Sequence, residues 1–403
     1  DLHLDSPFTG LSDIPERMFK DIRQSTFQAL DRLIQVAIER QVDFVLLVGD
    51  LFEHHQQSIK AQVHLREAFN RLKQEGIQVY VSYGNHDYLR GNPFKITFPE
   101  NVHVFPSEKV SSFYFQKDAQ TLAKIYGFSY EEQSLTQNKA MEFKRTETDI
   151  PFHIAMLHGS LESNTEHDTY APFQMRDLTS EGFDYWALGH IHRRAILKEN
   201  PWIVYPGNIQ GRHRKETGEK GCYYVTMTER ETSLQFIPLQ SVLFYDEEID
   251  VSSYNNLLAF EHLLYDLKKQ LKTSVPQLLY LSFINADQTF LDWERHGMIQ
   301  EFIDIANDTE QQTGESWQYI YRYNVIPFKK VSKNKSITEN HYFLNELIRQ
   351  YDALDVSESI HELWKHPLGR KFLEPLSEDD FEMLKKMAYE RIFSEFISHG
   401  RRS

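Results

Sequence analysis

The chain has 403 residues, 40% of them hydrophobic, and a formal net charge of −15, which is typical of a folded globular protein of two or three domains. Its single cysteine, Cys222, excludes an internal disulfide, and no apolar run is long enough to span a bilayer, so we expect a cytoplasmic protein without membrane contacts. The acidic excess argues against nucleic-acid binding through a basic surface of the chain's own.

Helical and strand patterns alternate in the first half of the chain. Apolar residues recur at helical spacing in 26–39 and 58–75. Buried strands, each followed by a polar loop, are predicted at 43–50, 77–87, 151–159 and 184–192. Short strands and hairpins are expected at 99–130 and 201–239. The alternation predicts an α/β fold in which helices cover a sheet. The chain opens at Asp1, and we expect a further strand before it.

The pattern changes near residue 244. Helices are predicted at 253–271 and 297–308, and strands at 277–286 and 316–326, which together predict a small α+β unit. Helical patterns dominate from about residue 336. The predicted domains are therefore 1–243, 244–330 and 331–403. The alternating tyrosines 319, 321 and 323 favour packing on a sheet over stacking on bases.

Five places in the first half share one property: Asp, Asn or His stands at or directly after the end of an apolar run. Carboxyl ends of parallel strands lie along one edge of a sheet, where binding sites form. The candidate metal ligands are Asp1, His3, Asp50, Asn85, His158, His190 and His192.

These ligand types suit Mn, Fe, Zn or Mg, and one cysteine cannot make a thiolate zinc site. Seven ligands are too many for one ion but suit two ions that share a carboxylate, an arrangement that promotes in-line attack at phosphorus. Each motif alone could be a polar loop that caps a strand. Five such motifs in order favour the metal site.

The order D-x-H, G-D, G-N-H-D, H, G-H-x-H resembles the calcineurin-like metallophosphoesterase superfamily. DLHLDSPF, VGDLFE, YGNHD, LHGS, LGHIH and YPGNIQGRHRKETGEKG resemble the SbcD-type DNA exonucleases, including YhaO-like bacterial proteins. The resemblance covers residues 1–240 well, extends to 245–330, and is poor beyond. It implies an α/β metallophosphoesterase β-sandwich flanked by helices, a small α+β capping domain and a helical C-terminal segment.

The resemblance also implies roles for individual residues. One ion would take Asp1, His3, Asp50 and His192, and the other Asp50, Asn85, His158 and His190, so that Asp50 bridges them. The expected ions are two Mn²⁺, with Mg²⁺, Fe²⁺ or Zn²⁺ as alternatives. His86 would assist catalysis beside the phosphate, oriented by a hydrogen bond that Asp87 accepts.

Two further features of the sequence leave alternatives open. Arg212 and His213 would lie near the substrate phosphate, unless their loop is only a solvated hairpin. Glu53 stands where some relatives have a histidine, so it does related polar work or leaves catalysis to His86 alone.

The implied function is a two-metal DNA exonuclease in DNA repair, with single-strand endonuclease activity as an option. The implied partners are DNA, an SbcC-like coiled-coil ATPase that docks on the C-terminal helices, and a second copy of the chain in a homodimer. Two alternatives stay open: a phosphoesterase acting on small molecules or phosphoproteins, and a non-catalytic scaffold of the same fold.

Overall fold

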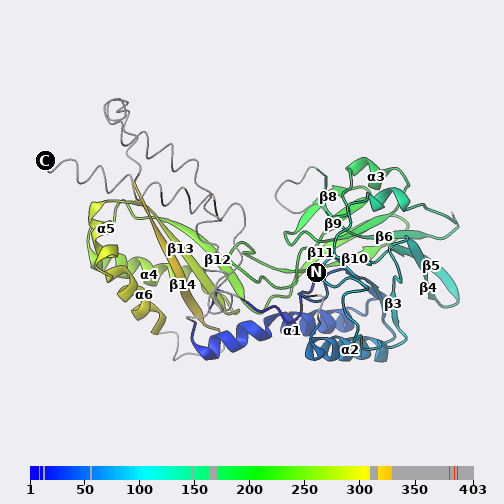
Figure 1. The fold of residues 1–403 in the computed structure, drawn as a ribbon, viewed down its shortest axis with the longest axis horizontal. Helices are drawn as coiled ribbons and strands as arrows, with labels where there is room; N and C mark the ends of the chain where they lie inside the picture. The colour runs from blue at the N-terminus through cyan, green and yellow to red at the C-terminus, as the bar shows by residue number, and fades with distance from the viewer. Residues whose placement is uncertain are drawn as a thin grey trace.

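The computed structural model describes residues 1–328, apart from 9, 12–13, 55–56, 148, 163–169 and 309–315, and beyond 328 only residues 381, 385 and 388. The helical segment predicted for 331–403, and ATPase docking on it, lie outside the described residues except at those three positions. Within the described part, no helix is both long enough and apolar enough to cross a membrane. Figure 1 shows two groups of sheets and helices, with the long helix α1 (Glu16–Glu39) running beneath both.

The larger group contains two sheets and a hairpin. The first sheet, in the order β1-β2-β3, is parallel and consists of β1 (Phe44–Val48), β2 (Gln78–Ser82) and β3 (Val102–Val104). The second has the order β4-β5-β6-β7-β9-β8. Its strands are β4 (Ser111–Lys117), β5 (Gln120–Gly127), β6 (Phe152–His158), β7 (Tyr185–Gly189), β8 (Ala195–Glu199) and β9 (Trp202–Tyr205). The hairpin joins β10 (Gly221–Met227) to β11 (Thr232–Pro238).

The two sheets pack face to face. Val48 and Tyr80 of the first sheet share a core with Met156 and Val204 of the second. The other face of the first sheet packs on α1 and α2 (Ile59–Gln74). The other face of the second sheet packs beside η1 (Lys139–Glu142) and α3 (Met175–Thr179). The α/β class, the sandwich and the four strands predicted ahead of polar loops are therefore confirmed.

The strands of the first sheet can be predicted from the local sequence because they are buried on both faces. Val79 and Val81 face the helices, and Tyr80 between them faces the second sheet. A strand covered on both faces needs an almost continuous apolar run. The continuous apolar runs are why the predicted strands match β1 and β2. The same pattern predicted β6 and β7, but it does not reveal that these two strands belong to a different sheet.

The smaller group is a parallel sheet with the order β12-β13-β14. Its elements are β12 (Leu243–Asp250), α4 (Leu257–Leu271), β13 (Gln277–Ala286), α5 (Gln288–Arg295), α6 (Met298–Asp308) and β14 (Gln318–Pro327). The predicted mixture of helices and strands is confirmed, but both strand pairs are parallel and helices connect consecutive strands, so the unit is α/β and not α+β. Helix α4 begins four residues later than predicted, because the Asn256 side chain accepts a 2.9 Å hydrogen bond from the amide of Ala259 and caps the helix there.

Two elements of this unit were not predicted. Strand β12 carries a run of acids on its exposed positions, and α5 has only eight residues. The tyrosine stripe was predicted correctly as a packing feature: Tyr319 and Tyr321 pack on one face of β14, and Tyr323 contacts the core on the other. The domain boundaries at 243 and 330 stay predictions.

Helix α1 begins ten residues earlier than predicted and joins the two groups. Its first turns place Met18 and Ile22 against Phe244 and Leu278 of the small sheet. The indole nitrogen of Trp317 donates a 3.0 Å hydrogen bond to Asp21. These first turns bury their apolar face on a distant part of the chain. The apolar stripe of residues 26–39, from which the helix was predicted, therefore does not extend to them.

Candidate metal centre

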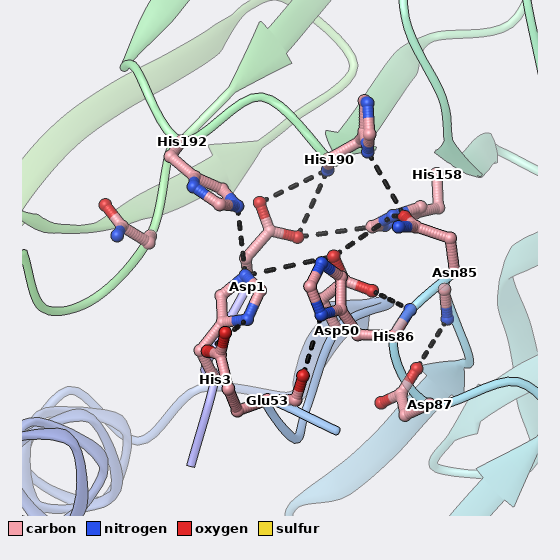
Figure 2. Close-up of polar contacts among 12 residues, drawn as sticks. Asp1, His3, Asp50, Glu53, Asn85, His86, Asp87, His158, His190 and His192 are labelled. Carbon is pink, nitrogen blue, oxygen red and sulfur yellow. Dashed lines mark hydrogen bonds and ion pairs between the residues drawn. The ribbon is translucent and has the colours of Figure 1, made fainter. Parts of the chain in front are cut away.

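The site forms where the carboxyl ends of strands from both sheets meet. Asp50 follows β1, Asn85 follows β2, His158 ends β6, and His190 follows β7. The segment that contains Asp1 and His3 runs beside residues 50–52, joined by a parallel bridge between Leu4 and Phe52. Figure 2 shows all seven predicted ligands converging.

Asp50 lies between two groups of ligand atoms. One group is His3, Asp50 and His192, and the other is Asp50, His158 and His190; in each, the ligand atoms lie within 4.8 Å of one another. The Asp50 side chain is 1% exposed, and its Oδ2 accepts no hydrogen bond from any described residue. This oxygen faces the Nε2 atoms of His158 at 3.5 Å and His3 at 3.8 Å. A shared, buried carboxylate with an unsatisfied oxygen fits a bridging ligand.

The His158 side of the site also fits a cation. His158 Nδ1 donates a 2.9 Å hydrogen bond to the carbonyl of Val48, so Nε2 of the neutral ring carries a lone pair. That lone pair faces Oδ1 of Asn85 at 2.9 Å, and His190 Nδ1 lies 3.2 Å from the same oxygen. Two acceptor atoms this close repel each other, and a cation coordinated by both would offset that repulsion.

On the other side, His3 and His192 bring their Nε2 atoms within 3.0 Å of each other. His192 Nδ1 donates to the carboxylate of Glu216 at 2.7 Å, and His3 Nδ1 lies 3.2 Å from Oε2 of Glu53. The Asp1 carboxylate, predicted on this side, accepts hydrogen bonds from the amide of His190 at 3.1 and 3.2 Å. In this arrangement Asp1 therefore faces the His190 loop as well.

The environment keeps the buried imidazoles neutral. Burial lowers the pKa of His3, His158 and His192, aided for His3 and His192 by the positive charge of Arg212. Burial alone would raise the pKa of Asp50, but nearby histidines and the His86 amide hold it at about 2. Neutral imidazoles and an ionised carboxylate are the protonation states that bind metals.

His86 lies close to the ligands but is held differently. Its amide donates to Oδ1 of Asp50 at 3.1 Å, and its Nδ1 donates to the backbone carbonyl of Glu53 at 2.7 Å. The prediction that a hydrogen bond to Asp87 orients the His86 ring is wrong, because the ring donates to the carbonyl of Glu53 instead. The Asp87 oxygens instead accept from the amides of Gly84 at 2.7 Å and Leu51 at 2.6 Å. Asp87 is fully buried, so it satisfies loop amides and positions His86 only through the backbone.

Arg212 and His213 lie on the His192 side. Arg212 is 9% exposed and pairs with Glu53 and, at 3.3 Å, with Glu216. His213 is 40% exposed and has its Nε2 3.4 Å from the Glu216 carboxylate. Nε of Arg212 has no partner among the described residues, but it is buried, so His213 is the more accessible of the two.

Glu216 is the site residue that sequence reasoning missed. Burial would raise its pKa, but Arg212 and His192 hold it well below the ordinary value, so the carboxylate is charged. The only signal in the sequence is that Glu216 is one of two acids inside the basic run RHRKETGEK. The backbone carbonyl of Glu53 accepts from His86 and its carboxylate pairs with Arg212, and both alternatives for the Glu53 side chain stay open.

The backbone around the ligands is tightly constrained. His3, Asp50 and His190 have φ values of 45°, 48° and 94°, a region that costs non-glycine residues about 1–3 kcal/mol each. At Gly84, a Cβ atom would lie 2.3 Å from Oδ1 of Asp50, and at Gly189, 2.0 Å from the carbonyl of Val48. The two sheets can approach this closely only because these positions have no side chain.

Comparison with known proteins agrees with this geometry. The calcineurin-like phosphoesterase family model matches residues 1–194. The chain is 38% identical over 390 residues to the "Uncharacterized metallophosphoesterase YhaO" of Bacillus subtilis (strain 168), covering 96% of this chain and 94% of that protein. It is 28% identical over 230 residues to the "DNA double-strand break repair protein Mre11" of Thermoplasma acidophilum, covering 54% and 60% of the two chains. The protein of the same name from Sulfolobus acidocaldarius is 20% identical over 347 residues, 81% and 84% of the two chains.

Proposed function

The chain belongs to the calcineurin-like phosphoesterases, and we propose that it is a two-metal phosphodiesterase that hydrolyses DNA from its ends. The observation that carries the two-metal part is the Asp50 carboxylate, which is buried and shared by two groups of ligand atoms. The DNA part is supported by relatives named as DNA double-strand break repair proteins.

We assign the metal ligands as the sequence predicted them. Asp1, His3 and His192 would hold one ion with Asp50, and Asn85, His158 and His190 would hold the other with it. Two divalent ions bound there, with Mn²⁺ as our first choice, supply the Lewis acidity for in-line attack of water on phosphorus.

His86 is the proposed acid for the leaving oxygen. When protonated, its Nδ1–H stays on the carbonyl of Glu53 at 2.7 Å, and its Nε2–H is available to the substrate. Asp87 supports this geometry by holding the amides of Gly84 and Leu51, which border the loops that carry His86 and Glu53. His213, with Arg212 behind it, would contact the phosphate backbone.

The proposed setting is DNA repair in the cytoplasm, as a homodimer with an SbcC-like ATPase. The net charge of −15 is the reason to include a partner, because a chain this acidic has little long-range attraction for DNA. The small β12–β14 unit would cap the site and steer the DNA.

Cleavage of end-labelled DNA tests the proposal. Purified protein is incubated with single- or double-stranded DNA in Mn²⁺, Mg²⁺ or EDTA, with His86→Ala as the control for contaminating nucleases. We expect shortening from an end with Mn²⁺ that is absent with EDTA and in the variant. If the wild-type protein binds metal and hydrolyses a generic phosphodiester but leaves DNA intact even with an ATPase partner, the DNA assignment is wrong.

A salt titration tests the role of the partner. Without a partner, DNA binding should be weak and should fall steeply as salt rises, because only a few basic groups and the ions would contact phosphates. Fluorescence anisotropy with a labelled oligonucleotide measures this. Nanomolar affinity at about 200 mM salt for the isolated chain would contradict it.

The acidic charge also favours a second candidate, a phosphodiesterase that acts on small molecules. Such a substrate needs no extended basic surface. Turnover of cyclic nucleotides compared with turnover of DNA ends, under the same metal conditions, separates the two candidates.

A further inference from the structure

We infer that Glu216 is a positioning residue for one of the two proposed ions, because it holds His192 in the orientation in which Nε2 can act as a ligand. This inference rests on the proposed two-metal site and goes beyond it, since Glu216 itself would not touch metal or substrate. According to this inference, the affinity for one ion depends on a charged side chain behind its ligand, and the affinity for the other ion does not.

The Glu216 carboxylate is itself held at both oxygens. Oε1 accepts the 2.7 Å hydrogen bond from Nδ1 of His192. Oε2 accepts from the side-chain amide of Asn208 and from the backbone amide of Arg212, both at 2.8 Å. With 6% side-chain exposure, Glu216 cannot turn away from His192 without leaving buried donors unpaired.

This contact sets the tautomer of His192. Nδ1 of His192 lies 2.7 Å from Oε1 of Glu216 and 3.1 Å from Nη2 of Arg212. Because the carboxylate is the nearer partner and only accepts, we assign the proton to Nδ1, and Nε2 of the neutral ring then keeps its lone pair. That Nε2 lies 3.0 Å from Nε2 of His3, in the group that includes Asp50. A carboxylate behind a ligating histidine fixes the ring and makes it a stronger ligand.

His158 shows why the effect should be confined to one ion. Its Nδ1 donates to the backbone carbonyl of Val48 at 2.9 Å, and its side chain is 1% exposed at the end of β6. No substitution of a partner side chain can remove that contact. His192 lies in a loop after β7 with a side chain that is 25% exposed, so its orientation depends on Glu216.

Metal titration of the full chain tests the inference. Isothermal calorimetry of metal-free protein with Mn²⁺ should show two binding events for the wild type. In Glu216→Gln, one event should weaken by about 10- to 100-fold while the other is unchanged. Glu219→Gln removes the same charge from an exposed position of the same loop and should bind like the wild type. Equal weakening of both events, or none, in Glu216→Gln would overturn the inference.

A second measurement needs no variant that could misfold. The ¹⁵N shifts of the His192 ring in metal-free wild-type protein, assigned through His192→Gln, should report a proton on Nδ1. A proton on Nε2 would overturn the inference. If the wild type binds no divalent ion at all, the two-metal proposal fails instead, so the two failures are distinguishable.

Discussion

The metal centre and the small β12–β14 unit are both built on parallel strands, but one buried side chain in each, Asp50 and Asn307, is held in opposite ways. In the small unit, Asn307 donates from Nδ2 to the carbonyl of Ile320 and accepts from its amide, both at 2.9 Å. At the metal centre, Oδ2 of Asp50 is buried and accepts no hydrogen bond from the described residues.

Other buried atoms of the described residues, such as Oε1 of Gln318, are also unpaired, but the Asp50 oxygen differs from them because it lies between two groups of ligand atoms. A buried group with all its hydrogen bonds stabilises a fold, whereas a buried group left unpaired costs about 1–3 kcal/mol. The strained φ values of His3, Asp50 and His190 add to the cost in the same place. Stability given up at one edge of the sandwich indicates that a ligand restores it.

The largest expected effect comes from exchanging the shared carboxylate. Asp50→Asn should lower phosphodiesterase activity on the order of 10⁴-fold, because both ions lose charge stabilisation worth several kcal/mol. It should also lower the stability of the metal-free protein at neutral pH, because the fold holds the pKa of Asp50 at about 2 and so stabilises its charge. Asn307→Ala should cost about 1–3 kcal/mol of stability while metal binding persists. Activity assays, calorimetry and urea unfolding measure these effects, and loss of metal binding in both variants would remove the contrast.

His86→Ala should lower activity by about 10²- to 10⁴-fold, the range for losing a general acid. It should keep the metal content of the wild type, because His86 belongs to the proposed catalytic group and not to the ligands. Elemental analysis of purified protein checks this. His54→Ala, at an exposed position of the adjacent loop, is the matched control and should change neither quantity. Loss of metal in His86→Ala would place that ring among the ligands.

Leu281→Ala should destabilise the chain through the small unit alone. The leucine is fully buried in the core between the small sheet and α4–α6, so its truncation should cost about 2–5 kcal/mol in unfolding free energy. The affinity for Mn²⁺ should stay as in the wild type. If calorimetry shows weaker metal binding, the two regions are coupled more strongly than their separate cores indicate.

Acidification should destabilise the metal-free protein gradually. The pKa values of His3 and His158 are lowered by burial, so below their unfolded value near 6.5 the unfolded chain binds protons that the folded chain does not. Stability should therefore fall with decreasing pH by up to about 1.4 kcal/mol per pH unit for each histidine. Urea unfolding from about pH 7 to about pH 5 measures the slope. His158→Asn should reduce the slope by the share of one among several histidines whose pKa values are lowered, and an unchanged slope would contradict this assignment.

Much of this protein could be predicted from local patterns. Apolar runs buried on both faces identified β1, β2, β6 and β7, and helical stripes identified α2 and the later turns of α1. The metal-ligand types could be predicted because Asp, Asn and His stand directly at strand ends, where chain direction alone brings them to one edge. These features depend on neighbours in the sequence, so the sequence by itself determined them.

Other features were decided only by the tertiary structure. Glu216 reaches His192 from a loop 24 residues later, Asp87 accepts from the amide of Leu51, and the first turns of α1 pack on a sheet more than 200 residues away. Hydrogen bonds and packing between distant segments leave no periodic signal, because each partner alone looks like an ordinary polar or apolar residue. The sequence therefore determined which groups can bind metal, and the packing of two sheets decided how those groups are held.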